Sequence, residues 1–464
     1  MRNLFGHKVA ELSCSSEMTE HWCIDHDETI HQKSTFDASL VQTGFVRDDT
    51  RLAASTQSIG NRMPLDKNVI PLSRKTRGRS VELFSGCGGL AFGLAFAGFK
   101  HDLLVEWDDH ACNTVNFNKA RRLRQVSNWP LAHADVRDIE WERYRGTDLV
   151  AGGPPCQPFS VGGKAAGDQD KRDMWPEAIR AVREIQPRAF IFENVRGLLR
   201  PAFSDYVNWI VAYLENPELV RGPMEPHLDH LSRLRAARDS ASYEVRVIPV
   251  NAADYGAPQK RNRVLVVGMR KDIGALPDFP APTHSQERLV WDKWVSAEYW
   301  EGHGLPRPAD SLIPNHEARI LRKLRLRNER PTEKAWLTCR DAFSGLGEPS
   351  IRHDTPNHIY QPGARVYPGH TGSPIDEPAK ALKAGVHGVP GGENMLARED
   401  GSVRYFSIRE AARLQGLPDE YQFPGSWTES MRQIGNAVPT QLAHFVGLWL
   451  GAFLQNKQPI TKVA

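Results

Sequence analysis

One cysteine stands where a nucleophile could act. The short apolar run Asp148–Ala151 leads into two glycines, two prolines and Cys156, which predicts a buried strand that ends in a stiff loop with one thiol. A loop at the carboxyl end of a strand is where open α/β sheets build their sites, and a thiolate attacks well even when little of it is ionised. The alternative is a buried cysteine that only fills space in a proline turn.

A carboxylate and two guanidinium groups occupy comparable positions farther along the chain. Glu193 follows the apolar run Phe190–Phe192, and a carboxylate there needs a partner or a task because burying it unpaired is costly. Arg261 and Arg263 precede another apolar run, where they could hold a phosphate, a base carbonyl or Glu193. The plainer interpretations are a structural carboxylate at a strand end and a charged surface turn.

A glycine-rich turn predicts a ligand site. Phe84–Gly89 lies between an expected strand and an expected helix, where glycines let backbone amides approach a ligand. Glu106 ends the next expected strand, where nucleotide-binding folds place the carboxylate that holds ribose hydroxyls. Trp107 could stack on a purine, and Asp135 could accept from an adenine amino group. The glycines lack the dinucleotide spacing, which favours an uncharged adenosyl ligand. If no ligand binds here, Glu106 is a solvated carboxylate at a strand end and Trp107 packs in the core.

The elements that must position these groups alternate between strands and helices. Apolar runs predict strands at 81–84, 103–106, 131–134, 148–151, 189–192, 245–250 and 264–268. Helical spacing predicts helices at 89–97, 107–119 and 176–185. This alternation predicts an α/β fold with a doubly wound, mostly parallel, Rossmann-like sheet.

Three other parts of the chain have a different composition. Residues 1–78 are polar and weakly periodic, which predicts a poorly ordered or accessory extension. Residues from about 270 to about 400 are rich in Pro, Gly, Trp and Arg, which indicates an inserted, smaller and irregular domain. Its basic stretch Arg319–Arg330 suits phosphate contacts, or else is a solvated amphipathic helix. Helices are expected again at 408–415 and 439–453.

Composition limits the class of protein. The 464 residues include 59 Lys and Arg against 56 Asp and Glu, a balance that neither demands nor excludes a polyanionic partner. None of the six cysteines has CxxC spacing, so we expect neither a metal site nor a disulfide framework, as in a reducing cytoplasm. The first residues do not resemble a signal peptide, and no apolar run approaches the ~18 residues of a membrane span. A soluble cytoplasmic protein is expected.

Six motifs, in order along the chain, resemble those of the cytosine-C5 DNA methyltransferases. They are Phe84–Gly89, Pro154–Ser160, Glu193–Val195, Gln259–Arg263, Ser407–Gly416 and Gln433–Pro439. The resemblance implies a class I methyltransferase domain over 79–268, an inserted target-recognition domain over 269–429, and a segment over 430–464 that returns to the catalytic domain. Residues 1–78 and residues from about 270 to about 400 contain no motif that matches this family.

The same resemblance implies methyl transfer from S-adenosylmethionine to C5 of a cytosine rotated out of duplex DNA. Cys156 would add to C6, Glu193 would contact N3 and the exocyclic amine, and Arg263, with Arg261 beside it, would brace the base and Glu193. The residues implied for the cofactor are Phe84, Ser85, Gly86, Gly88, Glu106, Trp107, Asp135, Val136, Pro155, Asn436 and Val438.

The expected partner is double-stranded DNA, bound by a monomer without a membrane, and a restriction endonuclease for the same sequence is a further candidate. Base readers are expected in the loops 357–370 and 385–394, where Arg365, His387 and Asn394 are candidates.

Other classes remain open at this point. An amino-group DNA methyltransferase also has a Pro-Pro loop, but an aromatic residue stands there in place of Cys156. A transfer-RNA cytosine methyltransferase would not need the large insertion. A catalytically silent DNA-binding relative would not need Cys156, Glu193 and both arginines. A Rossmann oxidoreductase would need a pyrophosphate turn, and a cysteine hydrolase would need a histidine base within these motifs.

Overall fold

The described part of the chain belongs to one compact unit. The computed structural model describes residues 70, 73, 75–155, 173–366, 368, 371–384, 394–398 and 400–455. All of these lie within the unit Pro64–Ala464. Most of the predicted extension 1–78 lies outside the described residues, and the first strand begins at Gly78, one residue before the predicted boundary.

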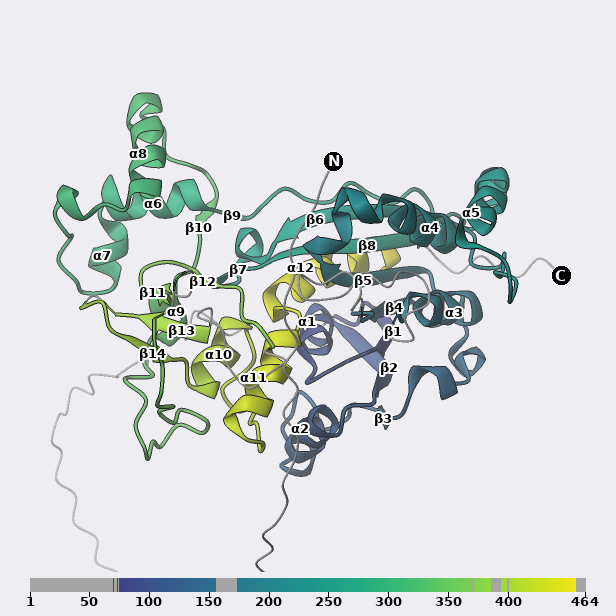
Figure 1. Cartoon of the computed structure of the whole chain (residues 1–464), viewed down its shortest axis with the longest axis horizontal. Coiled ribbons are helices and arrows are strands. Elements are labelled where there is room, and N and C mark those ends of the chain that lie inside the picture. The colour runs from purple at the N-terminus through teal and green to yellow at the C-terminus, as the bar shows by residue number, and fades with distance from the viewer. Residues whose placement is uncertain are drawn as a thin grey trace, which may run out of the picture. The chain divides into compact units, whose positions relative to one another are not determined.

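A seven-stranded sheet forms the centre of this unit (Figure 1). Its order is β3-β2-β1-β4-β5-β8-β6. The strands are β1 Gly78–Leu83, β2 Phe99–Glu106, β3 Leu131–His133, β4 Leu149–Gly152, β5 Ala189–Val195, β6 Tyr243–Asn251 and β8 Asn262–Arg270. The strands β3, β2, β1, β4 and β5 are parallel to one another, which confirms the predicted α/β class with a mostly parallel sheet.

Strand β8 runs against both of its neighbours, β5 and β6. The sequence pattern did not predict this reversal. Its cause is the connection from β6, since residues 252–261 hold only a short 3₁₀ turn and the two-residue strand β7, Gln259–Lys260. A parallel crossover needs a dozen or more residues, usually with a helix, whereas a short link can join only antiparallel neighbours.

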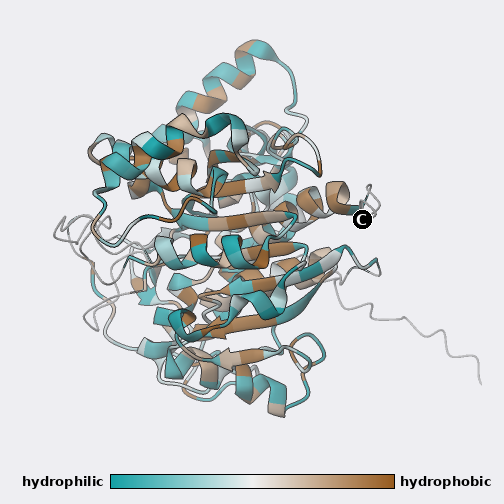
Figure 2. Ribbon diagram, turned by 90° about the vertical axis from the view of Figure 1, so that its right-hand side faces the viewer, coloured by the Kyte–Doolittle hydropathy of each residue, from teal (hydrophilic) through white to brown (hydrophobic). Residues whose placement is uncertain are grey.

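Helices cover both faces of the sheet, and alternate strand residues face opposite layers. In β5, Ala189 and Ile191 pack with α1 (Gly89–Ala97) and α12 (Thr440–Gln455). Phe190 and Phe192 pack on the other side, with α3 (Trp175–Ile185), α4 (Ser204–Glu215) and α5 (His227–Ala236). Figure 2 accordingly shows hydrophobic strands between helices whose outer faces are hydrophilic. Burial on both faces explains why these strands are continuous apolar runs in the sequence.

Helix α12 and α11 (Trp427–Asn436) form the one segment in the described part of the chain that is long and apolar enough to cross a membrane. Their apolar window is 72% buried inside the protein. The contact with α1 is close, because a Cβ at Gly93 would lie 2.3 Å from the Cβ of Ala443. A buried core helix can have the same length and apolar composition as a membrane-spanning helix, so this segment is only weak evidence for a membrane span.

Between residue 284 and α12, the described chain divides between two hydrophobic clusters. Helices α6 (Gln286–Trp294), α7 (Glu298–Gly302) and α8 (Asn315–Arg327) enclose a cluster of their own. The remaining elements pack instead with Phe92 and Leu104 of the sheet region. The helices among them are α9 Cys339–Phe343, α10 Ile408–Leu414 and α11, and α2 Asp109–Ala120, which precedes β8 in the chain, packs in the same cluster. The short strands β9 His284–Ser285 and β10 Lys334–Ala335 pair with each other beside the α6–α8 cluster. The other short strands are β11 Ser373–Pro374, β12 Ala379–Lys380, β13 Met395–Ala397 and β14 Val403–Tyr405.

Candidate active site

The carboxyl ends of four parallel strands bring the predicted site residues to one edge of the sheet. Strands β1 and β2 end beside the predicted cofactor residues, and β4 and β5 end beside the predicted chemical groups. This edge is where ligands bind in open α/β sheets, because the loops that follow the strands diverge there.

The turn after β1 has the backbone of a ligand cradle. Phe84 and Gly86 adopt positive φ values of 56° and 54°. A Cβ at Gly86 would have no atom within 4 Å, so the turn is open at this point. The hydroxyl of Ser85 is buried without a hydrogen-bond partner among the described residues. Since buried hydroxyls are normally paired, this oxygen fits a site that is completed by a ligand.

Gly88 differs from Gly86, because the ring of Trp129 packs tightly against it. Its φ is 91°, and a Cβ there would lie 2.5 Å from the ring of Trp129. Glycine is therefore needed at this position for packing against Trp129, and the space beside its Cα is filled by that ring.

Glu106, at the end of β2, faces the same turn. Its carboxylate accepts hydrogen bonds from the backbone N–H groups of Gly86 (2.7 Å), Trp107 (3.0 Å) and Asp108 (2.9 Å). These bonds fix the carboxylate and use three of its roughly four lone-pair sites. The ring of Trp107 next to it is 70% exposed, which is unusual for a tryptophan. A fixed carboxylate beside an exposed aromatic face suits a ribose with its attached purine.

Asp135 is already engaged by a neighbour. Its carboxylate accepts from the backbone N–H of Arg137 at 2.9 Å and forms an ion pair with that guanidinium at 2.5 Å. The hydrogen bond to Arg137 is the main reason why the pKa of Asp135 is lowered. An adenine amino group would have to share this carboxylate with Arg137, so the predicted contact stays a prediction. Val136 next to it is buried.

The segment after α11 lies against the first turn of α1. A Cβ at Gly89 would lie 2.5 Å from the carbonyl oxygen of Val438, so only glycine allows this approach. The side chain of Asn436 is exposed and that of Val438 is buried. The structure thus brings the two predicted C-terminal cofactor residues to the helix that follows the glycine turn, although more than 300 residues separate them in the sequence.

Glu193 and Arg263 form an ion pair where β5 meets β8. The Glu193 Oε1 and Arg263 Nε atoms are 2.7 Å apart, and the two side chains are 10% and 14% exposed. The pair lacks hydrogen-bond geometry, so Oε1 is buried without a hydrogen-bond donor among the described residues. The carboxylate therefore has a nearby positive charge and still has hydrogen-bonding capacity for a ligand.

The same carboxylate lies beside the loop that leads to the predicted nucleophile. A Cβ at Gly153 would lie 4.0 Å from Glu193 Oε2. The side-chain amide of Asn194 donates to the carbonyl oxygen of Pro154 at 3.0 Å and fixes the loop to β5. Pro155 is the last described residue before a gap, and Cys156 lies outside the described residues. Asn194 was not among the predicted site residues, although it belongs to the Glu193–Val195 motif.

Arg261 has a different environment from Arg263. Its side chain is only 2% exposed, and its guanidinium donates to the carbonyl oxygens of Leu382 (3.0 Å) and Gly435 (2.9 Å). Gln259, which is also buried, accepts from the backbone N–H of Leu382 at 3.0 Å. These contacts tie the strand before β8 to two distant segments, so the geometry gives Arg261 a positioning role and offers no contact with Glu193.

The candidate base readers also differ in what the structure shows. Asn394 is 1% exposed, and its amide is paired with the backbone N–H and carbonyl of Lys383. A side chain that is 1% exposed and engaged at both its oxygen and its nitrogen cannot contact a base edge, so the expectation for Asn394 is wrong. Arg365 is exposed, whereas His387 lies outside the described residues.

The described cysteines are chemically protected. Cys87, Cys112 and Cys339 are free and buried. Burial raises the pKa of Cys87 and of Cys112 to about 12, and it raises that of Cys339 further. Since the thiolate is the reactive form, we expect these three thiols to resist iodoacetamide at neutral pH in the folded protein. Peptide mass mapping before and after denaturation checks this; rapid alkylation of any of the three in the native state would contradict it.

Among the residues that the structure describes, His316, Glu317 and Glu377 form a cluster that could hold a metal ion. Glu317 is paired with Lys293 at 2.6 Å, and Glu377 is paired with Lys260 at 2.8 Å. Because the ammonium groups already neutralise both carboxylates, the cluster gives no reason to assign a metal.

Comparison with known proteins agrees with this geometry. The family model for C-5 cytosine-specific DNA methylase matches residues 78–218 and 226–451. The Type II methyltransferase M.NgoMIV of Neisseria gonorrhoeae is 32% identical over 372 residues, which cover 79% of this chain and 95% of that protein. M.Eco47II of Escherichia coli is 31% identical over 370 residues, which cover 79% of this chain and 77% of its own. The solved S. pombe Dnmt2 methyltransferase is 16% identical, with a TM-score of 0.47 over 80% of this chain and 98% of its own. The chain therefore belongs to the C-5 cytosine-specific DNA methylase family and is a DNA (cytosine-5)-methyltransferase.

Proposed function

We propose that this enzyme uses S-adenosylmethionine to methylate C5 of a cytosine that is rotated out of one specific duplex sequence, with Cys156 as the covalent nucleophile. The observation that carries the proposal is the position of Glu193. Its carboxylate lies beside Gly153, is paired with Arg263, and faces the loop whose next residue after Pro155 is Cys156. A base in this place would meet an acid, a cation and a thiol together.

The turn after β1 and the end of β2 fit the cofactor. The unpaired hydroxyl of Ser85 and the open space at Gly86 leave room for the methionine part of the ligand. Glu106 would hold the ribose hydroxyls, and the exposed face of Trp107 would stack on the adenine. When bound there, S-adenosylmethionine supplies the sulfonium methyl group that C5 takes up.

The side chains of this enzyme would activate the ring. The thiolate of Cys156 adds to C6, and the electron pair of the C5–C6 bond makes C5 nucleophilic. Glu193 accepts a hydrogen bond from the exocyclic amine and delivers a proton to N3 as negative charge builds up on the ring, while Arg263 orients the Glu193 carboxyl group. After C5 is substituted, a base removes the C5 proton, and the electron pair left behind expels Cys156 and restores the double bond.

Duplex sequence would be read by the inserted region, which we propose to be a target-recognition domain over residues 269–429. We further propose that the enzyme is a monomer in the cytoplasm of a bacterium, where a restriction endonuclease for the same sequence is its functional partner. The relatives named above are Type II methyltransferases, which supports a restriction-modification context.

Methyl transfer from labelled S-adenosylmethionine to duplex DNA and to transfer RNA tests the proposal directly. We expect label in DNA alone, and bisulfite sequencing of DNA from cells that express the chain should show 5-methylcytosine in one sequence context. Label in transfer RNA instead of DNA, or in neither while the cofactor is bound, would reject it.

Trp107 gives a test of the cofactor site that does not need turnover. Trp107→Ala should weaken S-adenosylmethionine binding by about 10- to 100-fold, because stacking of a base on an aromatic ring contributes ~1–3 kcal/mol. The protein should remain folded, since the ring is 70% exposed. Isothermal titration calorimetry measures the affinity. Phe117→Ala removes another exposed ring, on α2, as a control, and an equal loss in both variants would place the adenine elsewhere.

A further inference from the structure

One face of helix α8 presents cations that have no acidic partner in the part of the chain that the structure describes. Arg319, Arg322, Lys323 and Arg327 are exposed, and within the described residues none of the four has an ion-pair partner. They are separated by three, four and eight positions, the spacing that places residues on one side of a helix. We call these four residues, with the exposed Leu326 between them, the α8 stripe.

Two other arginines of the same stretch are different, because their charge is balanced. Arg325 is paired with Asp310 at 3.4 Å. Arg330 is paired with Asp292 at 3.3 Å and also contacts Glu298. Asp310 also pairs with Arg307, at 2.5 Å. The predicted basic stretch Arg319–Arg330 is therefore not a uniform surface, since two of its described arginines have acidic partners and the four cations of the stripe have none among the described residues.

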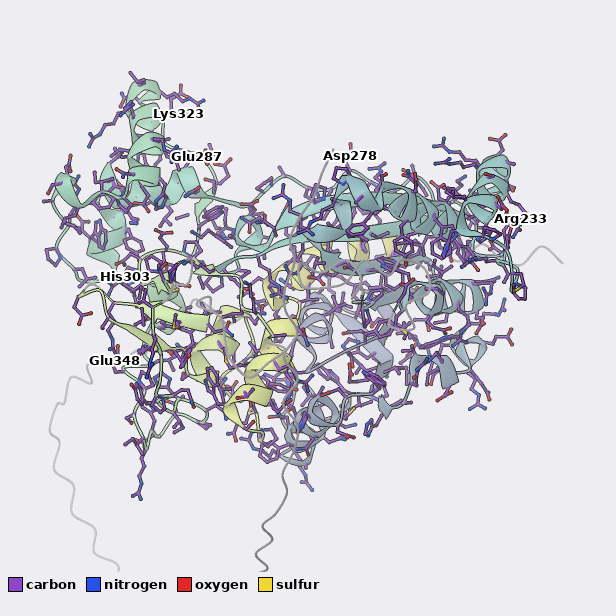
Figure 3. All side chains as sticks on the ribbon, viewed as in Figure 1. Arg233, Asp278, Glu287, His303, Lys323 and Glu348 are labelled. Atoms are coloured by element: carbon purple, nitrogen blue, oxygen red, sulfur yellow. The ribbon has the colours of Figure 1, made fainter. Side chains whose placement is uncertain are left out.

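The side of α8 opposite the stripe packs against the rest of the protein. Leu321 and Leu324 are buried in the cluster formed with α6 and α7. Glu317 accepts hydrogen bonds from Lys293 at 2.6 Å and from the Trp294 ring at 2.5 Å. Figure 1 shows α8 resting on α6, and Lys323 is labelled on α8 in Figure 3.

The chemistry of the stripe favours one kind of partner. Helices that bind a membrane surface present a broad apolar face with Trp, Phe or Leu beside their cations, whereas the stripe has a single leucine and the remaining apolar face is buried. A row of unpaired Arg and Lys suits the regularly spaced phosphates of a duplex, and Arg in particular can hold a phosphate through two hydrogen bonds.

We propose that the α8 stripe binds the phosphate backbone of duplex DNA without reading its sequence. This inference rests on the proposed function, and it adds a binding surface outside the strand edge where the chemistry takes place. The stripe would increase the affinity of the enzyme for any duplex, whatever its sequence, and leave base recognition to other residues of the insertion.

The salt dependence of binding tests the stripe. A labelled duplex of arbitrary sequence is titrated at several salt concentrations, and log K is plotted against log[salt]. Arg322→Gln should reduce the slope by about 0.9 and weaken binding roughly fivefold near 0.15 M salt, since each phosphate contact releases about that much counterion. The combined change of Arg319, Arg322, Lys323 and Arg327 to Gln should weaken binding by several hundredfold, on the order of 10³-fold, if the four contributions add.

Arg325→Gln is the matched control, because it changes the same residue type on the same helix but removes a cation that is paired with Asp310. It should change the slope clearly less than Arg322→Gln. All variants should keep the wild-type melting temperature and the wild-type kcat at saturating DNA, with the effect confined to KM for DNA.

Three results would overturn the proposal: an unchanged slope in the fourfold variant, a loss confined to one duplex sequence, or a loss of binding to anionic vesicles while duplex binding is intact. None of these would touch the proposed activity, which fails separately if the wild-type protein methylates no DNA.

Discussion

The Cys156→Ser variant is expected to lose about 10⁴-fold or more in kcat for methyl transfer, because removing the nucleophile of a covalent mechanism typically costs this much. A serine hydroxyl has nearly the shape of the thiol, but it is hardly ionised at neutral pH. Binding of S-adenosylmethionine and of duplex DNA should stay within about twofold of wild type, since the thiol contributes to neither.

Covalent trapping is the second measurement for this variant. Fluorine at C5 of the target cytosine cannot leave as a proton does, so the wild-type enzyme should remain attached to such an oligonucleotide on a denaturing gel. The serine variant should form no adduct. Cys339→Ala, which removes a fully buried thiol far along the chain, should trap as wild type does. The mechanism would be wrong if the serine variant turned over normally, or if the wild type modified native duplex but never formed the adduct.

The elements behind this prediction could be read from the sequence because each depends on residues close to one another. Strands β1, β2, β4 and β5 are buried on both faces, so each is a short apolar run bounded by a turn. Their carboxyl ends share an edge by the geometry of a parallel sheet, and that alone placed Glu106 and Glu193 at the site. The predicted helix 89–97 has the bounds of α1, because glycines stand at both of its ends.

The direction of β8 and the task of Arg261 could not be read in this way. Both depend on partners that are distant in the sequence: the guanidinium of Arg261 contacts carbonyl oxygens 121 and 174 residues away. An arginine that alternates with Gln259 and Arg263 before an apolar run has the same local pattern whether it faces a base or a carbonyl group. Asn394 was misjudged because nothing in the local sequence pattern shows that its amide pairs with the backbone of Lys383, 11 residues earlier.

Glu193 shows where local and distant contacts combine. The strand β5 places the carboxylate at the sheet edge, but its partner Arg263 comes from β8, whose antiparallel pairing puts Arg263 opposite Val195. Two elements that meet only in the folded sheet thus produce a paired acid beside the Pro154 loop. Removing the acid while keeping its shape should therefore affect chemistry more than any other single change outside Cys156.

Glu193→Gln is expected to lower kcat by about 10²- to 10³-fold, which is the usual contribution of a positioned acid, with the affinity for S-adenosylmethionine unchanged because the cofactor residues follow β1 and β2. Some stability should also be lost, since Arg263 would keep a buried charge without its partner. Single-turnover rates measured well below the melting temperature report the chemical step without the loss of stability, and calorimetry reports the affinity for the cofactor. Glu244→Gln removes another arginine-paired carboxylate, on β6, and should leave the rate unchanged. A variant of Glu193 that binds cofactor poorly but reacts at the wild-type rate once saturated would reassign this residue to the cofactor site.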